Sequence, residues 1–442
     1  MKLKMHHRTT SGLLATLAAF GAGMWLASQP GFTASAPAKP EANTNRCRLI
    51  LPEEIHAVVG REANLYFDNA VLVPNWRNLL FDVACNKGMQ QEERWTFVPQ
   101  AEDIGVHPLT LDVYSAEGER IASGKTTVRV VAADAGAGRE VRLLCIGDSL
   151  TNASVYPAEL ANLCKEAGNP RLTLLGTRQP YPDNPECRHE GYGGWTYQRF
   201  VTHYAPPSDA GDRLKQGSPF MFLADGKPRY DFSRYVREHC DGKNPDFVTI
   251  ALGCNDIFNA TEEEIETRIE TVLGYADTMI AGVRAAGAEI RIGLVLLVPP
   301  AASQDAFGAN YKCGQTRWQY RRNQHRMVER MMEKYGGREK ERLFLIPAYV
   351  NLDAARNYPT AEVPANARST VKIVRLNNGV HPAPAGYRQM ADSIYAWMKW
   401  LLASGQESQR GWQVDKRPTA NSSPGEGTGS VGRGGQQGGR GI

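Results

Sequence analysis

Five apolar segments separated by helix-like segments occupy the chain from residue 141 onward, and this alternation restricts the fold more than any other feature of the sequence. Each segment is short and mostly apolar, as expected for a strand that is buried on both faces. They are "VRLLCIG" at 141–147, "RLTLLGT" at 171–177, "PDFVTIALG" at 245–253, "EIRIGLVLLVPP" at 289–300 and "RLFLIPA" at 342–348. The pattern predicts an α/β fold in which helices cover both faces of a parallel sheet.

The segments between and after these strands show helical patterns. Helices are predicted at 155–168, from about 261 to 283, at about 316–335 and at 384–404. The second helix has the clearest start signal, because Thr261 is followed three residues later by Glu264, which is the pattern of a capping box. Residues 178–245 are too long for a simple connection and are rich in aromatic residues, Pro and Gly, so we expect an elaborated surface near the functional site.

The segment before the α/β region has a different pattern. Short apolar runs such as "ANLYFDNAVL" at 63–72 and "KTTVRVVAA" at 125–133 are separated by Gly, Asn, Asp and Pro. Several short strands at this spacing predict a small all-β domain, an immunoglobulin-like sandwich. The predicted organisation is a leader at 1–38, a linker at 39–46, a β-sandwich at 47–133, the α/β domain at 141–403 and a disordered Gly- and Ser-rich tail at 405–442.

The first residues have the order of a secretory signal peptide. Three basic residues within the first eight precede an apolar stretch at 12–27, and the small residues of "TASAPAK" follow. We therefore predict cleavage near Ala36 or Ala38, a secreted or periplasmic protein and no stable membrane insertion after cleavage. An uncleaved anchor is the alternative, although the Gly and Ala content of the stretch is weak for a membrane span.

The composition is that of an ordinary globular protein, with 42% hydrophobic and 22% charged residues. Its formal net charge is only +4 over 442 residues, and basic residues alternate with acidic ones. We therefore expect no nucleic acid partner. The oligomeric state cannot be read from this composition.

Eight cysteines are scattered along the chain, and none lies in a Cys-x-x-Cys pair, so a zinc ribbon or a redox motif is not predicted. In an oxidising compartment Cys47 and Cys85 could pair, and Cys187, Cys240 and Cys313 are further candidates. Two other cysteines lie in or next to the apolar, strand-like runs. Cys145 and Cys254 lie within or beside them, so we expect these two to be buried free thiols.

Polar residues follow several of the predicted strands, at the edge of the sheet where ligands collect in parallel α/β folds. Ser149 follows the first strand in "IGDSL", Asn255 follows the third in "LGCND", and His381 precedes the last helix in "NGVHP". Gly194 lies in the loop "HEGYGGWT" after the second strand. Each has a purely structural alternative, as a helix cap, a turn residue, a loop glycine or a buried histidine. Four such residues at one edge instead indicate a reaction site.

Together and in this order, "GDSL", the glycine of "GGWT", "GCND" and "GVHP" resemble the four blocks of the GDSL or SGNH hydrolase family over about residues 141–403. The resemblance implies a flavodoxin-like three-layer fold and ester hydrolysis through an acyl-enzyme, with no metal or cofactor. Ser149 would be the nucleophile and His381 the base. The oxyanion hole would consist of the backbone N–H groups of Ser149 and Gly194 and the amide of Asn255.

Asn378 departs from the family pattern, in which the residue three positions before the histidine is usually Asp. An Asn carbonyl can still accept a hydrogen bond from Nδ1 of the ring, but it carries no charge. The working hypothesis is a Ser149–His381 dyad assisted by Asn378 or by a main-chain carbonyl. Two alternatives remain open, namely Asp353 as the acid and an inactive, binding-only descendant.

The substrate is predicted less closely than the chemistry. The resemblance covers acetylesterases that act on polysaccharides as well as lipases, lysophospholipases and thioesterases. The leader, the β-sandwich and the aromatic residues Tyr192 and Trp195 favour a carbohydrate O-acetylesterase, with these two rings contacting a small or polymeric sugar ester. Trp195 could equally be a core residue. A lipase-type esterase and a non-catalytic carbohydrate-binding protein are the alternatives, and a third is that the β-sandwich itself carries the ligand.

Overall fold

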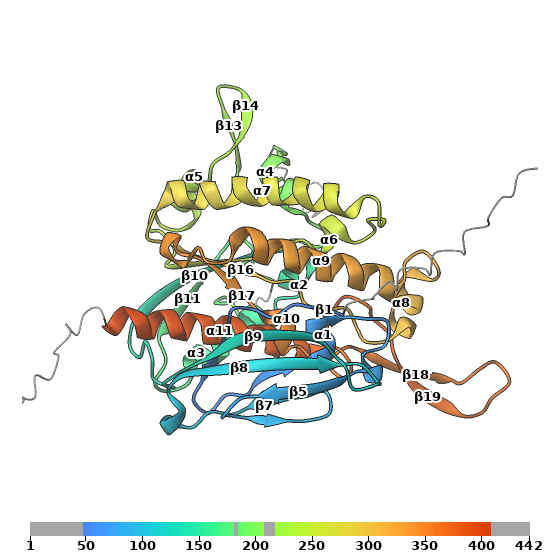
Figure 1. The fold of residues 1–442 in the computed structure, drawn as a ribbon. Helices are drawn as coiled ribbons and strands as arrows, with labels where there is room; N and C mark the ends of the chain where they lie inside the picture. The colour runs from blue at the N-terminus through green and yellow to red at the C-terminus, as the bar shows by residue number, and fades with distance from the viewer. Residues whose placement is uncertain (1–46, 181–183, 207–216, 408–442) are drawn as a thin grey trace, which may run out of the picture. The chain divides into compact units, whose positions relative to one another are not determined.

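The computed structural model describes residues 47–180, 184–206 and 217–407 (Figure 1). Arg46–Ile442 groups as one compact unit. The predicted leader and linker, and the predicted tail beyond residue 407, lie outside the described residues. Within these ranges no helix has the length and apolar character needed to cross a membrane.

A parallel sheet forms the centre of the α/β region and confirms the predicted fold class. Its strand order is β11-β10-β15-β16-β17, and all of these pairs are parallel. If these five strands are numbered 1 to 5 in the order in which they occur in the sequence, their order across the sheet is 2-1-3-4-5, which is the flavodoxin-like order. The strands are β10 (Glu140–Gly147), β11 (Arg171–Leu175), β15 (Phe247–Ala251), β16 (Arg291–Val295) and β17 (Leu343–Ile346), and the two-residue β12 (Glu190–Gly191) pairs with the end of β10.

The two faces of the sheet are covered by different helices (Figure 1). Leu143 and Cys145 of β10 belong to one hydrophobic cluster and Leu144 and Ile146 to the other, as the twofold alternation of a strand requires. The first cluster includes residues of α3 (Val155–Lys165) and α11 (Pro384–Glu407). The second includes residues of α7 (Ile265–Ala286) and α9 (Arg317–Tyr335).

The start of α7 follows the predicted capping signal, and α9 begins at a threonine cap that the structure reveals. Thr261 N donates to Glu264 Oε2 and Glu264 N donates to Thr261 Oγ1, both at 3.3 Å, so the reciprocal bonds of a capping box are present just before α7. At α9, Oγ1 of Thr316 accepts a hydrogen bond from Gln319 N at 3.1 Å. Both helices therefore begin where the sequence provides acceptors for their first N–H groups.

Shorter elements lie between the core strands and helices. Residues 178–245 contain α4 (Tyr197–Thr202), the hairpin of β13 (Met221–Ala224) with β14 (Lys227–Tyr230), and α5 (Phe232–His239). Further along the chain are α2 (Ser149–Asn152), α6 (Cys254–Ile257), α8 (Gln304–Tyr311), α10 (Ala348–Asn351) and the hairpin of β18 (Thr360–Pro364) with β19 (Lys372–Leu376).

The N-terminal region is built mainly from β-strands. One sheet has the order β2-β9-β8-β5 and a second has the order β3-β7-β6. Buried residues from both sheets, including Leu111 and Trp95, belong to the same hydrophobic cluster as α9. The strands are β1 (Arg48–Leu49), β2 (Glu54–Val58), β3 (Ala63–Tyr66), β4 (Val71–Leu72), β5 (Leu80–Ala84), β6 (Met89–Gln90), β7 (Arg94–Phe97), β8 (Gly105–Tyr114) and β9 (Arg120–Val131).

The run at 63–72 is not one strand, which corrects the sequence-based expectation. A single helical turn, α1 (Phe67–Ala70), separates β3 from β4. Its carbonyl groups face Arg321 of α9, whose Nη2 donates to the oxygens of Asp68, Asn69 and Val71. These bonds satisfy backbone acceptors that a continuous strand would have used in a sheet, and so they account for the interruption.

Arg321 is only 2% exposed, and burial lowers its pKa to about 10. A buried cation of this kind is stable only when its N–H groups have partners, and here the partners come from the N-terminal region. The α/β region and the N-terminal region are therefore joined by a buried polar contact as well as by apolar packing.

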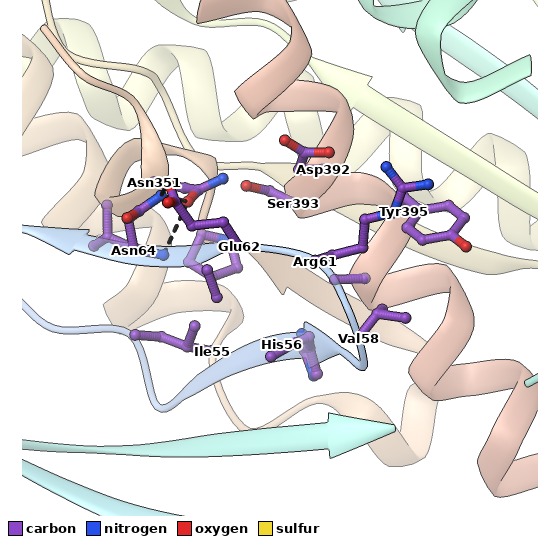
Figure 2. Close-up of a pocket in the computed structure, with 15 residues that line it drawn as sticks. Ile55, His56, Val58, Arg61, Glu62, Asn64, Asn351, Asp392, Ser393 and Tyr395 are labelled. Carbon is purple, nitrogen blue, oxygen red and sulfur yellow. Dashed lines mark hydrogen bonds between the residues drawn. The ribbon is translucent and has the colours of Figure 1, made fainter. Parts of the chain in front are cut away.

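A second polar contact joins the regions at the cavity shown in Figure 2. Asn351 Oδ1 accepts hydrogen bonds from Asn64 N at 3.0 Å and from Asn64 Nδ2 at 3.1 Å. The cavity measures ≈30 Å³, and Arg61 and Asp392 are among the residues that line it. Burial raises the pKa of Asp392 from 3.8 to about 6, so its charged form is disfavoured in the folded protein.

All eight cysteines are free in this structure, which corrects the expectation of pairing among Cys47, Cys85, Cys187, Cys240 and Cys313. Cys145 and Cys254 are buried free thiols, as predicted. Burial raises the pKa of the Cys145 thiol to about 12, so it stays protonated and unreactive.

We predict that Arg321→Leu lowers the free energy of unfolding by about 3–5 kcal/mol, because it leaves two buried carbonyl groups and one part-buried carbonyl group without this donor. Urea denaturation followed by circular dichroism measures the change. Arg322→Leu is the matched control, since Arg322 is the next residue of α9 and pairs with the exposed Glu262. A loss no greater than that of the control would contradict the role given to Arg321.

We predict that Asp392→Asn stabilises the protein by about 1 kcal/mol near pH 8 and has little effect near pH 4. The pKa of Asp392 is raised on folding, so the wild-type side chain contributes stability at low pH that is lost as the pH rises from about 4 through about 6. Thermal unfolding of both proteins across this range measures the difference. Asp82→Asn on the exposed side of β5 is the control, and parallel pH profiles for wild type and Asp392→Asn would refute the prediction.

Candidate active site

Ser149 lies at the carboxyl end of β10, where the strand turns directly into the short helix α2. The preceding residue, Asp148, caps this turn because its Oδ1 accepts a hydrogen bond from Leu150 N at 2.9 Å. Asp148 is 1% exposed, and burial raises its pKa to about 7. The turn therefore presents the partly exposed Ser149 hydroxyl at the edge of the sheet.

His381 reaches this edge from the loop between β19 and α11. Its Nε2 lies 2.8 Å from Ser149 Oγ, although the two residues are 232 positions apart in the sequence. Partial burial lowers the pKa of His381, which favours the neutral imidazole near pH 7. A neutral ring can accept the hydroxyl proton, so the structure brings the two predicted residues together in the geometry of a nucleophile and its base.

Asn378 does not contact the ring, which corrects the prediction that its carbonyl orients His381 through Nδ1. Its Oδ1 instead accepts hydrogen bonds from the backbone N–H groups of Val380 at 3.1 Å and His381 at 2.9 Å. Among the residues that the structure describes, none accepts a hydrogen bond from Nδ1 of His381. Asn378 therefore fixes the backbone turn that carries the histidine.

The alternative acid, Asp353, is not near His381 by any described contact. Its Oδ1 accepts hydrogen bonds from the N–H groups of Ala355 and Arg356, both at 3.0 Å. Its Oδ2 has longer contacts, at 3.4 Å from the hydroxyl of Tyr66 and at 3.3 Å from Arg356 Nη1. Asp353 thus belongs to the contact with the N-terminal region.

Asn255 lies between the other two predicted oxyanion residues. It is in α6, after β15, and its Nδ2 donates to Trp195 O at 3.0 Å and to Asp148 Oδ2 at 3.3 Å. One acceptor precedes Ser149 and the other follows Gly194 directly, so the amide is held beside both. Gly194 is exposed and has a φ of +75°, a conformation that favours glycine. No hydrogen bond among the described residues occupies the N–H group of Ser149 or Gly194.

Glu190, which sequence reasoning missed, anchors the loop that leads to Gly194. It is 0% exposed, and its carboxyl oxygens accept hydrogen bonds from the hydroxyls of Tyr192 and Tyr235, both at 2.7 Å. Thr177 donates to the same carboxyl through its N–H at 2.6 Å and its hydroxyl at 3.0 Å. Burial raises the pKa of Glu190, while these donors favour the charged form.

His189 supports the same loop from its other side. Its Nδ1 accepts a hydrogen bond from Gly191 N at 3.0 Å, so Nε2 carries the proton and donates to Ser154 Oγ at 2.8 Å. This second Ser–His pair is fully buried and therefore structural. The adjacent His189 and Glu190 in "HEGYGG" could have indicated both supporting residues from the sequence. Two ionisable residues next to a glycine-rich loop are uncommon in a buried strand.

Tyr192 and Trp195 are core residues, and the prediction that they bind substrate is corrected. They are 3% and 2% exposed, and their rings stack on each other with centroids 4.3 Å apart. Phe200 packs against the edge of the Trp195 ring at 4.9 Å. Because both rings are enclosed, neither presents a face to a bound molecule.

A small apolar cavity of ≈20 Å³ adjoins the site. It is lined by the neighbours of the reactive groups, including Leu150 beside Ser149 and Val380 beside His381. A void of this size accommodates about one water molecule or methyl group. Within the described ranges, no group of three or more His, Cys, Asp or Glu side chains is arranged to hold a metal ion.

The sequence matches the family model described as GDSL-like lipase/acylhydrolase over residues 143–394, which is more than half of the chain. No curated protein matches it. Among solved structures, it is similar to a possible lipase from Chitinophaga pinensis, with 14% identity and a TM-score of 0.32, covering 60% of this chain and 100% of the other.

Two further structures are similar at the same low level. The acetylxylan esterase Axe2 from Geobacillus stearothermophilus has 14% identity and a TM-score of 0.29, covering 59% of this chain and 94% of its own. The lipase Lip_vut3 from a goat rumen metagenome has 13% identity and a TM-score of 0.29, covering 58% of this chain and 96% of its own. The assignment rests on the family match, and by that match the chain belongs to the GDSL-like lipase/acylhydrolase family and is an ester hydrolase.

Proposed function

We propose that this ester hydrolase works through an acyl-enzyme formed on Ser149, with His381 as the general base. Nε2 of His381 takes the hydroxyl proton as Oγ attacks the acyl carbon, and then gives it to the departing alcohol. A water molecule, activated by the same nitrogen, then releases the acid. The observation that carries the proposal is the 2.8 Å separation of Ser149 Oγ and His381 Nε2.

The proposed oxyanion hole consists of the N–H groups of Ser149 and Gly194 and the side-chain amide of Asn255. Asn255 Nδ2 is anchored to Trp195 O at 3.0 Å, whereas its bond to Asp148 Oδ2 is long, at 3.3 Å. The N–H group that makes the long bond is the one an oxyanion would recruit. Donors fixed before the reaction stabilise the developing charge without reorganisation, which is usually the largest single contribution to catalysis.

The preferred substrate in this proposal is a short-chain ester of a carbohydrate, above all an O-acetyl group. The cavity of ≈20 Å³ lined by Leu150 and Val380, the sequence neighbours of Ser149 and His381, has room for the methyl group of an acetyl but not for a long acyl chain, and we take this to favour an acetylesterase over a lipase. The leader predicted at residues 1–38 supports an extracellular or periplasmic setting, where polysaccharides occur.

We predict that Ser149→Ala lowers the kcat of aryl acetate hydrolysis by at least about 10³-fold, because it removes the nucleophile. Ser393→Ala is the control, since among the described residues the hydroxyl of this serine bonds to Gln389 O of its own helix, at 3.1 Å, and to no other group. A spectrophotometric assay also compares aryl acetate with aryl octanoate, and the wild type should prefer acetate. Full activity in Ser149→Ala would refute the mechanism, and a preference for octanoate would refute the short-chain assignment alone.

We predict that Asn378→Asp changes the kcat at about pH 8 by less than about threefold but moves the acidic limb of the pH profile to higher pH. A carboxylate can accept the same two N–H bonds, so the turn is kept, while its negative charge favours protonated His381. In the wild type burial lowers the pKa of His381, so activity should persist below about pH 6.5. Asn378→Ala should lose activity through the lost turn contacts, and an unshifted limb in Asn378→Asp would contradict the electrostatic argument.

A further inference from the structure

A second and larger cleft lies between the N-terminal region and the carboxyl ends of β16 and β17. It measures ≈120 Å³, against ≈20 Å³ for the cavity beside Ser149. At the volume that a water molecule occupies in the liquid, it holds roughly four water molecules. α1 packs beside α10 at this contact (Figure 1). The lining residues come from both regions and include Tyr66, Asp68, Trp76, Arg77, Arg317 and Asp353.

The cleft is connected to the histidine loop by a short series of hydrogen bonds. Ala302 lines the cleft and donates to Ala354 O at 2.8 Å, and its neighbour Ala301 donates to Gly379 O at 3.1 Å. Gly379 is two residues before His381. By chain geometry the cleft wall is therefore no more than roughly 22 Å from the catalytic ring. A short oligosaccharide can span this distance.

The charges lining the cleft are nearly balanced. Asp68, Glu93 and Asp353 supply carboxylates, and Arg77 and Arg317 supply guanidinium groups. Arg317 is held in place, because its Nη2 donates to Asp68 Oδ2 at 3.2 Å and its Nε donates to Ala301 O at 3.1 Å. Planar groups of both signs around one space suit a neutral ligand with many hydroxyl groups better than an ion.

Two acceptors in the cleft retain unused hydrogen-bonding capacity. Asn69 is 1% exposed and lines the cleft, and its Nδ2 donates to Leu352 O at 2.7 Å. No described donor reaches its Oδ1. Asp353 Oδ2 has only the two long contacts, at 3.3 Å and 3.4 Å. Asn69 Oδ1 is not a fully enclosed, unpartnered atom, so water or a ligand hydroxyl can reach it, and Asp353 Oδ2 can accept a further, shorter hydrogen bond.

Trp76 gives the cleft an aromatic surface. It is partly exposed, and its ring is covered by the guanidinium of Arg77 at 4.6 Å from the centroid. The Arg77 side chain is 61% exposed and reaches Glu93 only through a long contact of 3.4 Å. A flat ligand can therefore replace the guanidinium at little cost, since such exposed pairs contribute little to stability.

We propose that this cleft is a binding subsite for an uncharged sugar unit of the substrate, at a position removed from the ester that Ser149 attacks. The inference rests on the proposed function, because it assigns the esterified alcohol to a saccharide. The sugar stacks on Trp76 through its apolar face and donates hydroxyl protons to Asn69 Oδ1 and Asp353 Oδ2. The N-terminal region then contributes directly to substrate selection.

The test compares Trp76→Ala with wild type on two substrates, aryl acetate and acetylated xylan oligosaccharides. Trp76→Ala should lower kcat/KM on the oligosaccharides about tenfold through KM and leave aryl acetate hydrolysis within twofold. Trp76→Phe should recover most of the loss, because it keeps an aromatic face. A further variant, Arg77→Ala, removes the guanidinium that covers Trp76. Arg120→Ala is its matched surface control, since the Arg120 and Arg77 side chains are 60% and 61% exposed and each has one long ion pair. Because the sugar displaces the Arg77 guanidinium from the Trp76 ring, Arg77→Ala should not raise the KM for oligosaccharides, and a rise beyond that of Arg120→Ala would overturn the stacking on Trp76.

Calorimetric titration of Ser149→Ala with deacetylated xylan oligosaccharides provides a measurement that does not need catalysis. If Ser149→Ala binds the oligosaccharides and Ser149→Ala/Trp76→Ala does not, the subsite is supported. If the wild type nevertheless fails to deacetylate the oligosaccharides, only the acetylesterase proposal fails. Equal oligosaccharide kcat/KM in wild type and Trp76→Ala overturns the subsite while the esterase survives. Absence of binding to Ser149→Ala, with no oligosaccharide turnover by the wild type, overturns both.

Discussion

Two arginines one turn apart on α9 hold the N-terminal region and the histidine loop in one arrangement. Arg321 is buried and donates to the backbone carbonyls of Asp68, Asn69 and Val71. No other described residue of the α/β region donates a hydrogen bond to these three carbonyls. Arg317 contacts Asp68 and also the carbonyl of Ala301, whose N–H group in turn bonds to Gly379. The position of His381 therefore depends on contacts made well outside the catalytic edge of the sheet. The N-terminal region is part of the support of the site.

The site itself combines loosely and tightly held parts. Ser149 and His381 each lie on a turn fixed by the side chain of a nearby residue, Asp148 or Asn378. The loop before Gly194 is fixed much more strongly, by a buried carboxylate with four donors and by a buried histidine. Oxyanion donors must be positioned accurately before the reaction, whereas the imidazole must move a proton between two partners, so the difference in rigidity matches the difference in task.

The sequence predicted the α/β fold and four site residues because these depend on local signals. Strand hydrophobicity, capping pairs and the four family blocks are all readable over a few residues. The errors concern long-range contacts. The turn at α1 forms because Arg321, some 250 positions away, supplies donors. Trp195 is buried by Tyr192 and Phe200, and Asn378 turns toward its own backbone, and neither outcome is encoded by the residue type. Asp353 was a reasonable acid by position, but it faces Tyr66.

The shared core of the two regions has a consequence for the history of such a chain. The family match begins at residue 143, inside β10, and ends at residue 394, inside α11, and it leaves out the three backbone carbonyls that Arg321 binds. Once α9 carried a buried arginine, deletion of the N-terminal extension would have exposed apolar surface and stranded a charge at the same time. Reversal then requires coordinated substitutions in the hydrolase half. The N-terminal region is thus not a detachable module, because the hydrolase half keeps an apolar surface and a buried charge that both need it.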